Sequence, residues 1–141
     1  MTRFAAAINC MDGRVQSPVV EYIRHHHGVD YVDMITEPGV DLILAEQADT
    51  ETCDSIRNRL DISYQTHGSR LFFVIGHHDC AGNLSDRDGH LRQIEAAVAR
   101  VRAWVPEGVV VGLWVDENWV VHEVPSTETV TGRQEDGSVV G

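Results

Sequence analysis

The stretch LFFVIGHHDC, residues 71–80, decides the fold of this chain. Its first five residues, 71–75, are all apolar, and a run of this length before a glycine is typical of a fully buried strand. Such strands occur in parallel sheets that helices cover on both faces. We therefore predict an α/β fold, with the polar residues His77 to Cys80 at the carboxyl end of this strand.

The segments around this strand alternate between strand-like and helix-like patterns. Short apolar runs predict further strands at residues 4–9, 31–35, 109–115 and 119–124. Apolar residues at helical spacing predict helices at 18–27, 41–47, 49–67 and 90–104, the first with Ser17 as its cap and Pro18 at its first position. The alternation indicates a mostly parallel sheet of order 2-1-3-4, with a final antiparallel edge strand and flanking helices.

The length and composition are those of one globular domain. The 141 residues are 43% hydrophobic and 23% charged, which is close to the average of globular proteins. We predict a single α/β domain over residues 1–124. Residues 125–141 form a polar tail that has little to bury, a composition typical of disorder.

Charge and hydropathy exclude several classes of partner. Acidic residues outnumber basic ones by 22 to 11, so the attraction that drives nonspecific nucleic-acid binding is missing. No apolar run approaches the ~20 residues of a membrane helix, and the N-terminus lacks the pattern of a signal peptide. We expect a cytoplasmic protein without nucleic-acid or membrane partners. In a reducing compartment its three cysteines are expected to be free, reactive or bound to metal.

Three potential metal ligands follow two of the predicted strands. Cys10 comes directly after the strand at 4–9, and His77 and Cys80 follow the strand at 71–75. In the order 2-1-3-4 the strand order reverses between these two strands, and ligands bind at such points. Two thiolates and an imidazole suit zinc, and three protein ligands leave its fourth position open for water. We therefore predict a zinc site, with activity that favours alkaline pH because two thiolates make the bound water harder to ionise.

A carboxylate and a guanidinium accompany this ligand set. Asp12 is two residues from Cys10, so it is a candidate for the fourth zinc ligand or for a hydrogen bond to zinc-bound hydroxide. Arg14 can hold the Asp12 carboxylate in a bidentate pair and so decide between the two roles.

The segments CMDGR, residues 10–14, and GHHDC, residues 76–80, resemble the paired signature of β-class carbonic anhydrases, Cys-x-Asp-x-Arg and His-x-x-Cys. The resemblance extends over most of residues 4–124 and implies a small, divergent member with a short N-terminus. It also implies a zinc cofactor, a homodimer or higher homo-oligomer, and reversible hydration of carbon dioxide to bicarbonate by zinc-bound hydroxide. The roles that it implies are zinc ligation by Cys10, His77 and Cys80 and catalysis by Asp12 and Arg14.

The chain departs from the family pattern at two places beside these motifs. Thr36-Glu37-Pro38-Gly39 stands where the family has Arg-Asn-Ala-Gly, which replaces an arginine region by a carboxylate. Ala81 stands where a glycine usually follows the second cysteine, and Gly82 comes one residue later. The wall of the pocket is therefore expected to differ from that of the family.

Three alternatives to carbon dioxide hydration remain open. The same zinc site could hydrolyse carbonyl sulfide or carbon disulfide, which present the same kind of electrophilic carbon. Asp12 could fill the fourth position permanently, which would make the protein a non-catalytic zinc-binding protein. A thiol redox protein would instead use Cys10 and Cys80 without a metal.

Other residues that could carry chemistry have simpler interpretations. His78 competes with His77 as the ligand, and the His-x-x-Cys spacing favours His77. We interpret Cys53 as a packed thiol, Glu37 and Asp79 as turn residues, and the run 25–27 of three histidines as a helix end. The default interpretation of Trp104, Trp114 and Trp119 is packing in the core or at a subunit interface.

Overall fold

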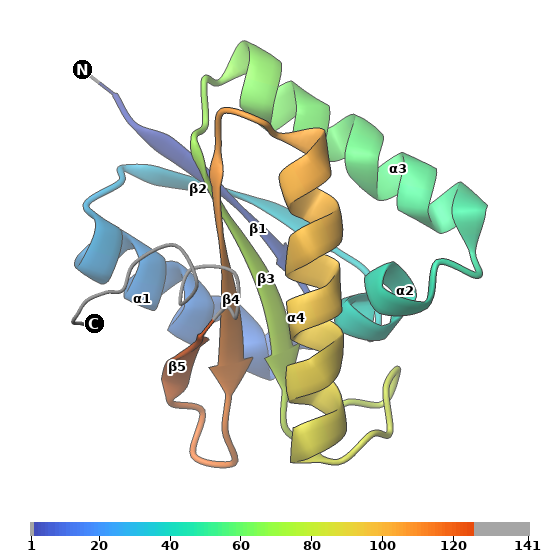
Figure 1. The fold of residues 1–141 in the computed structure, drawn as a ribbon. Coiled ribbons are helices and arrows are strands. Elements are labelled where there is room, and N and C mark those ends of the chain that lie inside the picture. The colour runs from blue at the N-terminus through green and yellow to red at the C-terminus, as the bar shows by residue number, and fades with distance from the viewer. Residues whose placement is uncertain (1, 126–141) are drawn as a thin grey trace, which may run out of the picture.

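The computed structural model describes residues 2–125 (Figure 1). The polar tail predicted for residues 125–141 lies outside the described residues except for Pro125. The five strands are β1 (Phe4–Asn9), β2 (Tyr31–Thr36), β3 (Leu71–His77), β4 (Val109–Val115) and β5 (Val121–Val124). The α-helices are α1 (Gln16–His27), α2 (Val40–Glu46), α3 (Thr50–Asp61) and α4 (Arg87–Trp104). A 3₁₀ turn (Gly13–Val15) precedes α1, and a π-helical turn (Ile62–Thr66) continues α3.

The strands form one sheet of order β2-β1-β3-β4-β5, which confirms the predicted topology. The first four strands pair in parallel, and β5 pairs antiparallel with β4. Ile8 of β1 lies beside Ile35 of β2 on one side and Val74 of β3 on the other. The strand order thus reverses between β1 and β3, so the carboxyl ends of these two strands border one crevice.

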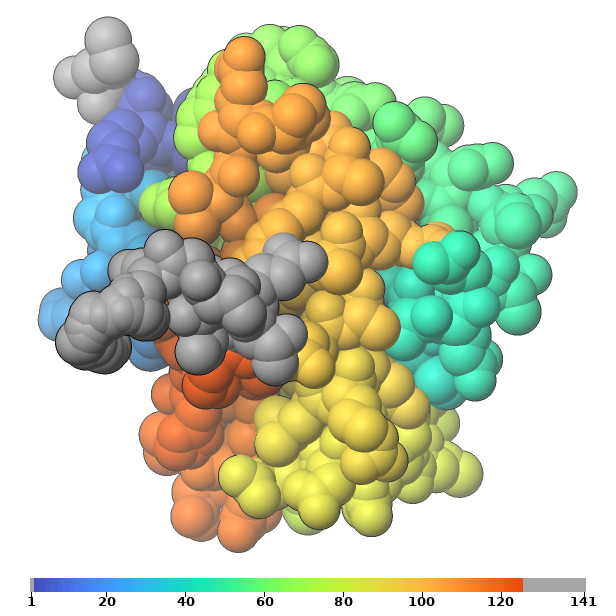
Figure 2. Space-filling model, in the orientation of Figure 1, coloured from blue at the N-terminus to red at the C-terminus, as the bar shows by residue number. Residues whose placement is uncertain are grey.

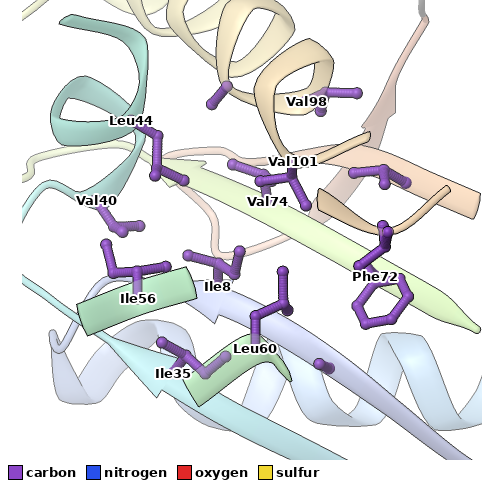
Figure 3. Close-up of a cluster of buried hydrophobic side chains, with 14 of the residues drawn as sticks. Ile8, Ile35, Val40, Leu44, Ile56, Leu60, Phe72, Val74, Val98 and Val101 are labelled. Atoms are coloured by element: carbon purple, nitrogen blue, oxygen red, sulfur yellow. The ribbon is translucent and has the colours of Figure 1, made fainter. Parts of the chain in front are cut away.

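Helices cover both faces of the sheet (Figure 1). On one face α2, α3 and α4 enclose a core whose side chains Leu44, Leu60 and Val101 point toward Ile8 and Val74 of the strands (Figure 3). On the other face the 3₁₀ turn packs through Val15, and α1 packs through Val19 and Ile23. Figure 2 shows α4 exposed along the first face, with α2 and α3 beside it. The continuous apolar runs of β1 and β3 are explained by this burial on both faces.

Some element ends differ from the sequence prediction. The prediction that Ser17 caps the first helix is wrong, because the 3₁₀ turn leads directly into α1 and the cap position, Val15, makes no side-chain capping bond. The helix does end at Gly28, whose φ of 66° gives it the left-handed conformation of a C-cap. The strand β3 extends two residues beyond its apolar run and includes His77. None of the described helices is both long enough and apolar enough to cross a membrane.

Candidate metal centre

Cys10 is the first residue after β1, and two amides shape the loop that carries it. The side-chain oxygen of Asn9 accepts a hydrogen bond of 2.8 Å from the backbone N–H of Cys10. The side-chain amide of Gln16 donates to the carbonyl oxygens of Cys10 at 2.7 Å and of Asp12 at 3.2 Å. Because Asn9 is fully buried, the position of the Cys10 backbone is set from within the core.

His77 and Cys80 come from the end of β3 and the loop after it. His77 is the last residue of β3 and pairs with Val115 of β4. The chain then turns at Asp79, whose φ is 59°, and the turn brings Cys80 back toward β1. Cys80 forms a β-bridge with Asn83, whose N–H donates to the Cys80 carbonyl oxygen at 3.2 Å.

The three predicted ligands are brought together in this crevice. The Sγ atoms of Cys10 and Cys80 are 3.8 Å apart, and one ligand atom of each of the three residues lies within 4.8 Å of the others. All three side chains are buried. Among the cysteine, histidine and acidic side chains of the described residues, these three form the only group whose spacing suits a metal ion.

The imidazole of His77 is oriented for metal binding. Its Nδ1 donates to the carbonyl oxygen of His78 at 2.7 Å, which leaves Nε2 with a free lone pair. Within residues 2–125, Nε2 of His77 is the only buried side-chain nitrogen or oxygen atom without a hydrogen-bond partner. Such an orphaned acceptor beside two thiols fits a soft or borderline cation, and zinc is the common choice for this donor set.

The two thiols share one proton. The hydrogen bond from Cys80 lowers the pKa of Cys10 to about 3, although burial opposes the shift. The same bond raises the pKa of Cys80, because its proton is held between the two sulfurs. Backbone N–H groups of Gly39 and Asp12 also donate to Cys10, and those of Gly82 and Asn83 donate to Cys80. The pair thus carries a negative charge in a buried place, where a dication can replace the remaining proton.

Asp12 and Arg14 form the bidentate pair that their spacing predicted. Nη2 of Arg14 lies 2.7 Å from Oδ2 of Asp12, and Nε lies 3.1 Å from Oδ1. The backbone N–H of Arg14 also donates to Oδ1, so Asp12 caps the 3₁₀ turn. These hydrogen bonds from Arg14 lower the pKa of Asp12 to about 2. Asp12 is not a member of the three-residue ligand group.

Two further residues hold the guanidinium of Arg14, and sequence reasoning missed both roles. Nη1 donates to Oδ2 of Asp79 at 3.2 Å, and Nη2 donates to the Asp79 carbonyl oxygen at 3.1 Å. The guanidinium carbon of Arg14 lies over the indole ring of Trp119, from the β4–β5 turn, at 4.7 Å from the ring centre. The centres of the Trp119 and His77 rings are 6.1 Å apart. Trp119 has a left-handed backbone conformation, with φ of 61°, and no pattern in the sequence around it indicates this conformation or the contact with Arg14.

The remaining candidates lie outside the ligand group. His78 is exposed, whereas His77 is buried. The carboxylate of Glu37 forms an ion pair of 2.5 Å with Arg59 of α3. Cys53 of α3 is buried, and its thiol lies near the carbonyl oxygen of Ile43 in α2 and the guanidinium of Arg100 in α4.

The three histidines at 25–27 form the end of α1, as predicted. His27 contacts Glu123 of β5 at 3.1 Å. The indole of Trp114 is buried and lies 5.2 Å from the His90 ring, which agrees with its interpretation as a packing residue.

Residues 1–125 match a family model described as "Putative carbonic anhydrase". The chain belongs to this family. A comparison with curated protein sequences gives no match. Membership in the carbonic anhydrase family agrees with the resemblance seen in residues 10–14 and 76–80.

Solved structures with the same fold include β-carbonic anhydrases. Isoform I from Trichomonas vaginalis has a TM-score of 0.58 and 18% identity, covering 86% of this chain and 82% of its own. A tetrameric β-carbonic anhydrase from Sordaria macrospora has a TM-score of 0.59 and 12% identity, with coverage of 87% and 80%. A carbon disulfide hydrolase in its apo form has a TM-score of 0.60 and 14% identity, with coverage of 99% and 87%. At these identities the similarity establishes the carbonic anhydrase fold of this chain.

Proposed function

We propose that this protein binds one zinc ion through Cys10, His77 and Cys80 and catalyses the reversible hydration of carbon dioxide to bicarbonate and a proton. The observation that carries the proposal is the free Nε2 of buried His77, which lies with the two sulfurs in one group of ligand spacing. In a family of carbonic anhydrases this donor set leaves one zinc position for water.

Bound zinc would act as a Lewis acid that lowers the pKa of a water molecule to roughly 7. The chain supplies the rest of the chemistry. Asp12 accepts a hydrogen bond from the attacking water, and Arg14 keeps this carboxylate turned toward itself at 2.7 Å. That orientation supports an open site, because a carboxylate held bidentately by Arg14 is not free to fill the fourth metal position.

The oligomeric state belongs to the same proposal. One of the structures that share this fold is described as tetrameric. We expect this chain to form a homodimer or a larger homo-oligomer, which light scattering of the purified protein measures directly. We also expect the protein to be cytoplasmic.

Carbon disulfide or carbonyl sulfide is the second candidate substrate. The fold neighbour with the broadest coverage of this chain among the three described above is a carbon disulfide hydrolase. Both compounds expose an electrophilic carbon to the same attacking water. Release of hydrogen sulfide from either compound, with slow hydration of carbon dioxide, would favour this candidate.

Stopped-flow hydration of carbon dioxide by zinc-loaded protein, from about pH 7 to about pH 9, tests the proposal. We expect activity that rises toward alkaline pH and that Cys10→Ser abolishes. Cys53→Ser is the matched control, because Cys53 is also a buried thiol but lies outside the ligand group. Wild-type activity no higher than that of Cys10→Ser would overturn the proposal. Elemental analysis of the same samples separates a zinc protein from a thiol redox protein without metal.

A further inference from the structure

Three buried polar side chains lie beside the candidate metal centre without being part of it. Asp41 belongs to α2, Asn83 to the loop after Cys80, and His90 to α4, and each is at most 2% exposed. Burial of such groups costs free energy unless their hydrogen bonds are satisfied, and an apolar replacement is often no less stable. The contacts of these side chains indicate a role other than stability.

Asp41 is the centre of this group. His90 Nδ1 donates to its Oδ2 at 2.6 Å, and Asn83 Nδ2 donates to its Oδ1 at 3.0 Å. The backbone N–H of Leu42 donates to the same Oδ1 at 3.0 Å. The Asn83 amide also contacts Oε1 of Gln93 at 2.7 Å. We call Asp41, Asn83 and His90 the buried network.

The buried network joins two glycine turns that touch each other. Asp41 is two residues after Gly39, and Asn83 follows Gly82 directly. A Cβ atom on Gly39 would lie 2.4 Å from the carbonyl oxygen of Gly82, so the two backbones are in direct contact. The hydrogen bond between Asp41 and Asn83 thus holds one turn against the other.

Each of these turns donates hydrogen bonds to one of the cysteine sulfurs. The N–H of Gly39 donates to Cys10 and that of Gly82 to Cys80, and the N–H of Asn83 is shared between the sulfur and the carbonyl oxygen of Cys80. Hydrogen bonds to a thiolate favour its charged form, which is the form that binds metal. Displacement of either turn would remove donors from the sulfur that it faces.

The third ligand also adjoins the buried network. A Cβ atom on Gly76 would lie 2.5 Å from Oδ2 of Asp41 and 3.2 Å from Nδ1 of His90. The Asp41–His90 pair therefore packs against the backbone of β3 immediately before His77. One small cluster thus supports the chain beside all three ligands.

We propose that Asp41, Asn83 and His90 are positioning residues that hold the Gly39 and Gly82 turns against the two sulfurs and thereby set the affinity of the centre for zinc. This inference rests on the metal site of the proposed function and not on its catalytic activity. Partners outside the direct ligands typically change metal affinity by about 10- to 100-fold.

The test is the zinc affinity of the full-length protein, measured by competition with a chromophoric chelator. Asn83→Ala removes the link between the turns but keeps the backbone N–H that faces Cys80. Ser69→Ala is the matched control, because Ser69 is fully buried, its Oγ lies 2.6 Å from that of Ser63, and it precedes the amino end of β3. The thermal stability of each metal-free variant is measured beside its affinity.

We expect Asn83→Ala to bind zinc about 10- to 100-fold more weakly than wild type, and Ser69→Ala to bind it as wild type does. The absorption of the cobalt-substituted Asn83→Ala protein should also show altered sulfur-to-metal bands. Equal zinc affinities of Asn83→Ala and Ser69→Ala would overturn the inference. If Asn83→Ala does not fold, His90→Phe removes the hydrogen bond of 2.6 Å to Oδ2 of Asp41 but keeps an aromatic ring in its place, and an unchanged zinc affinity in that variant would overturn the inference equally.

Failure of the proposed function can be distinguished from failure of this inference. A protein that depends on Asn83 for zinc affinity but hydrates no carbon dioxide would overturn the proposed reaction and leave the buried network supported. An active enzyme whose zinc affinity does not depend on Asn83 would support the proposed reaction and overturn the role of the buried network.

Discussion

Arg14 binds Asp12 through both its backbone and its guanidinium: the N–H, Nε and Nη2 donate to the carboxylate at 2.9, 3.1 and 2.7 Å. The same guanidinium reaches Asp79 of the loop that carries Cys80. Arg14 therefore connects the loop after β1 with the loop after β3, across the crevice that holds the three ligands.

Replacement of Arg14 should release Asp12 toward the metal. In Arg14→Gln we expect normal zinc content but a hydration rate about 10- to 100-fold lower, because the carboxylate gains access to the fourth position. The absorption spectrum of the cobalt-substituted variant should then respond weakly to added anions. Arg59→Gln is the control, since Arg59 of α3 also pairs with a carboxylate, that of Glu37, but does not contact Asp12. A strong response to anions in both variants would contradict this role of Arg14.

Trp119 should matter for activity and not for metal content. Removal of the indole in Trp119→Ala uncovers one face of the Arg14 guanidinium, so Asp12 is held less firmly. We expect kcat to fall about two- to fivefold with zinc content unchanged. Trp104→Ala is a matched control, because Trp104 stacks on Arg57 at 5.6 Å and lies at the far end of α4. Equal kcat values in the two variants would show that the contact is irrelevant to the reaction.

Gly39→Ala should damage the metal centre more than the fold. Gly39 and Gly68 have similar positive φ angles, 61° and 71°, so alanine introduces similar backbone strain at each, about 1–2 kcal/mol. Only at Gly39 would the new Cβ meet the Gly82 backbone, whereas nothing lies within 4 Å of it at Gly68. Zinc titration should therefore show weaker binding in Gly39→Ala and wild-type binding in Gly68→Ala. Equal zinc affinities would mean that the close contact of the two turns is unimportant.

Tyr22 should make the fold sensitive to alkaline pH. Burial and the hydrogen bond of 2.8 Å to Glu123 raise the pKa of Tyr22 to about 12, above its ordinary value of about 10. Between these two values the unfolded chain releases the proton that the folded chain retains, so stability falls as pH rises through this window. Thermal unfolding should show a smaller fall in Tyr22→Phe. Tyr31→Phe leaves the contact between Tyr22 and Glu123 intact, so its stability should fall with pH as that of the wild type does. The same dependence of stability on pH in all three proteins would exclude this role of Tyr22.

Much of the fold could be predicted from the sequence because its signals are local. The apolar run at 71–75 is long enough for a buried strand, and the alternation with helical segments restricts the sheet to few topologies. Helix and strand ends depend on capping and on neighbouring turns. For that reason the local sequence predicts a cap at Ser17, whereas the 3₁₀ turn leads directly into α1 and puts Val15 at the cap position.

The candidate ligands Cys10, His77 and Cys80 were also predictable, because each follows a strand and parallel strands end at one edge. Only the tertiary structure decided what surrounds them. Trp119 faces Arg14 because the β4–β5 turn folds over the crevice, and Asp41 meets His90 because α2 and α4 pack together on one face. Such contacts join residues far apart in the chain, and their side-chain directions depend on how the helices cross the sheet. No local pattern in a single sequence carries that information.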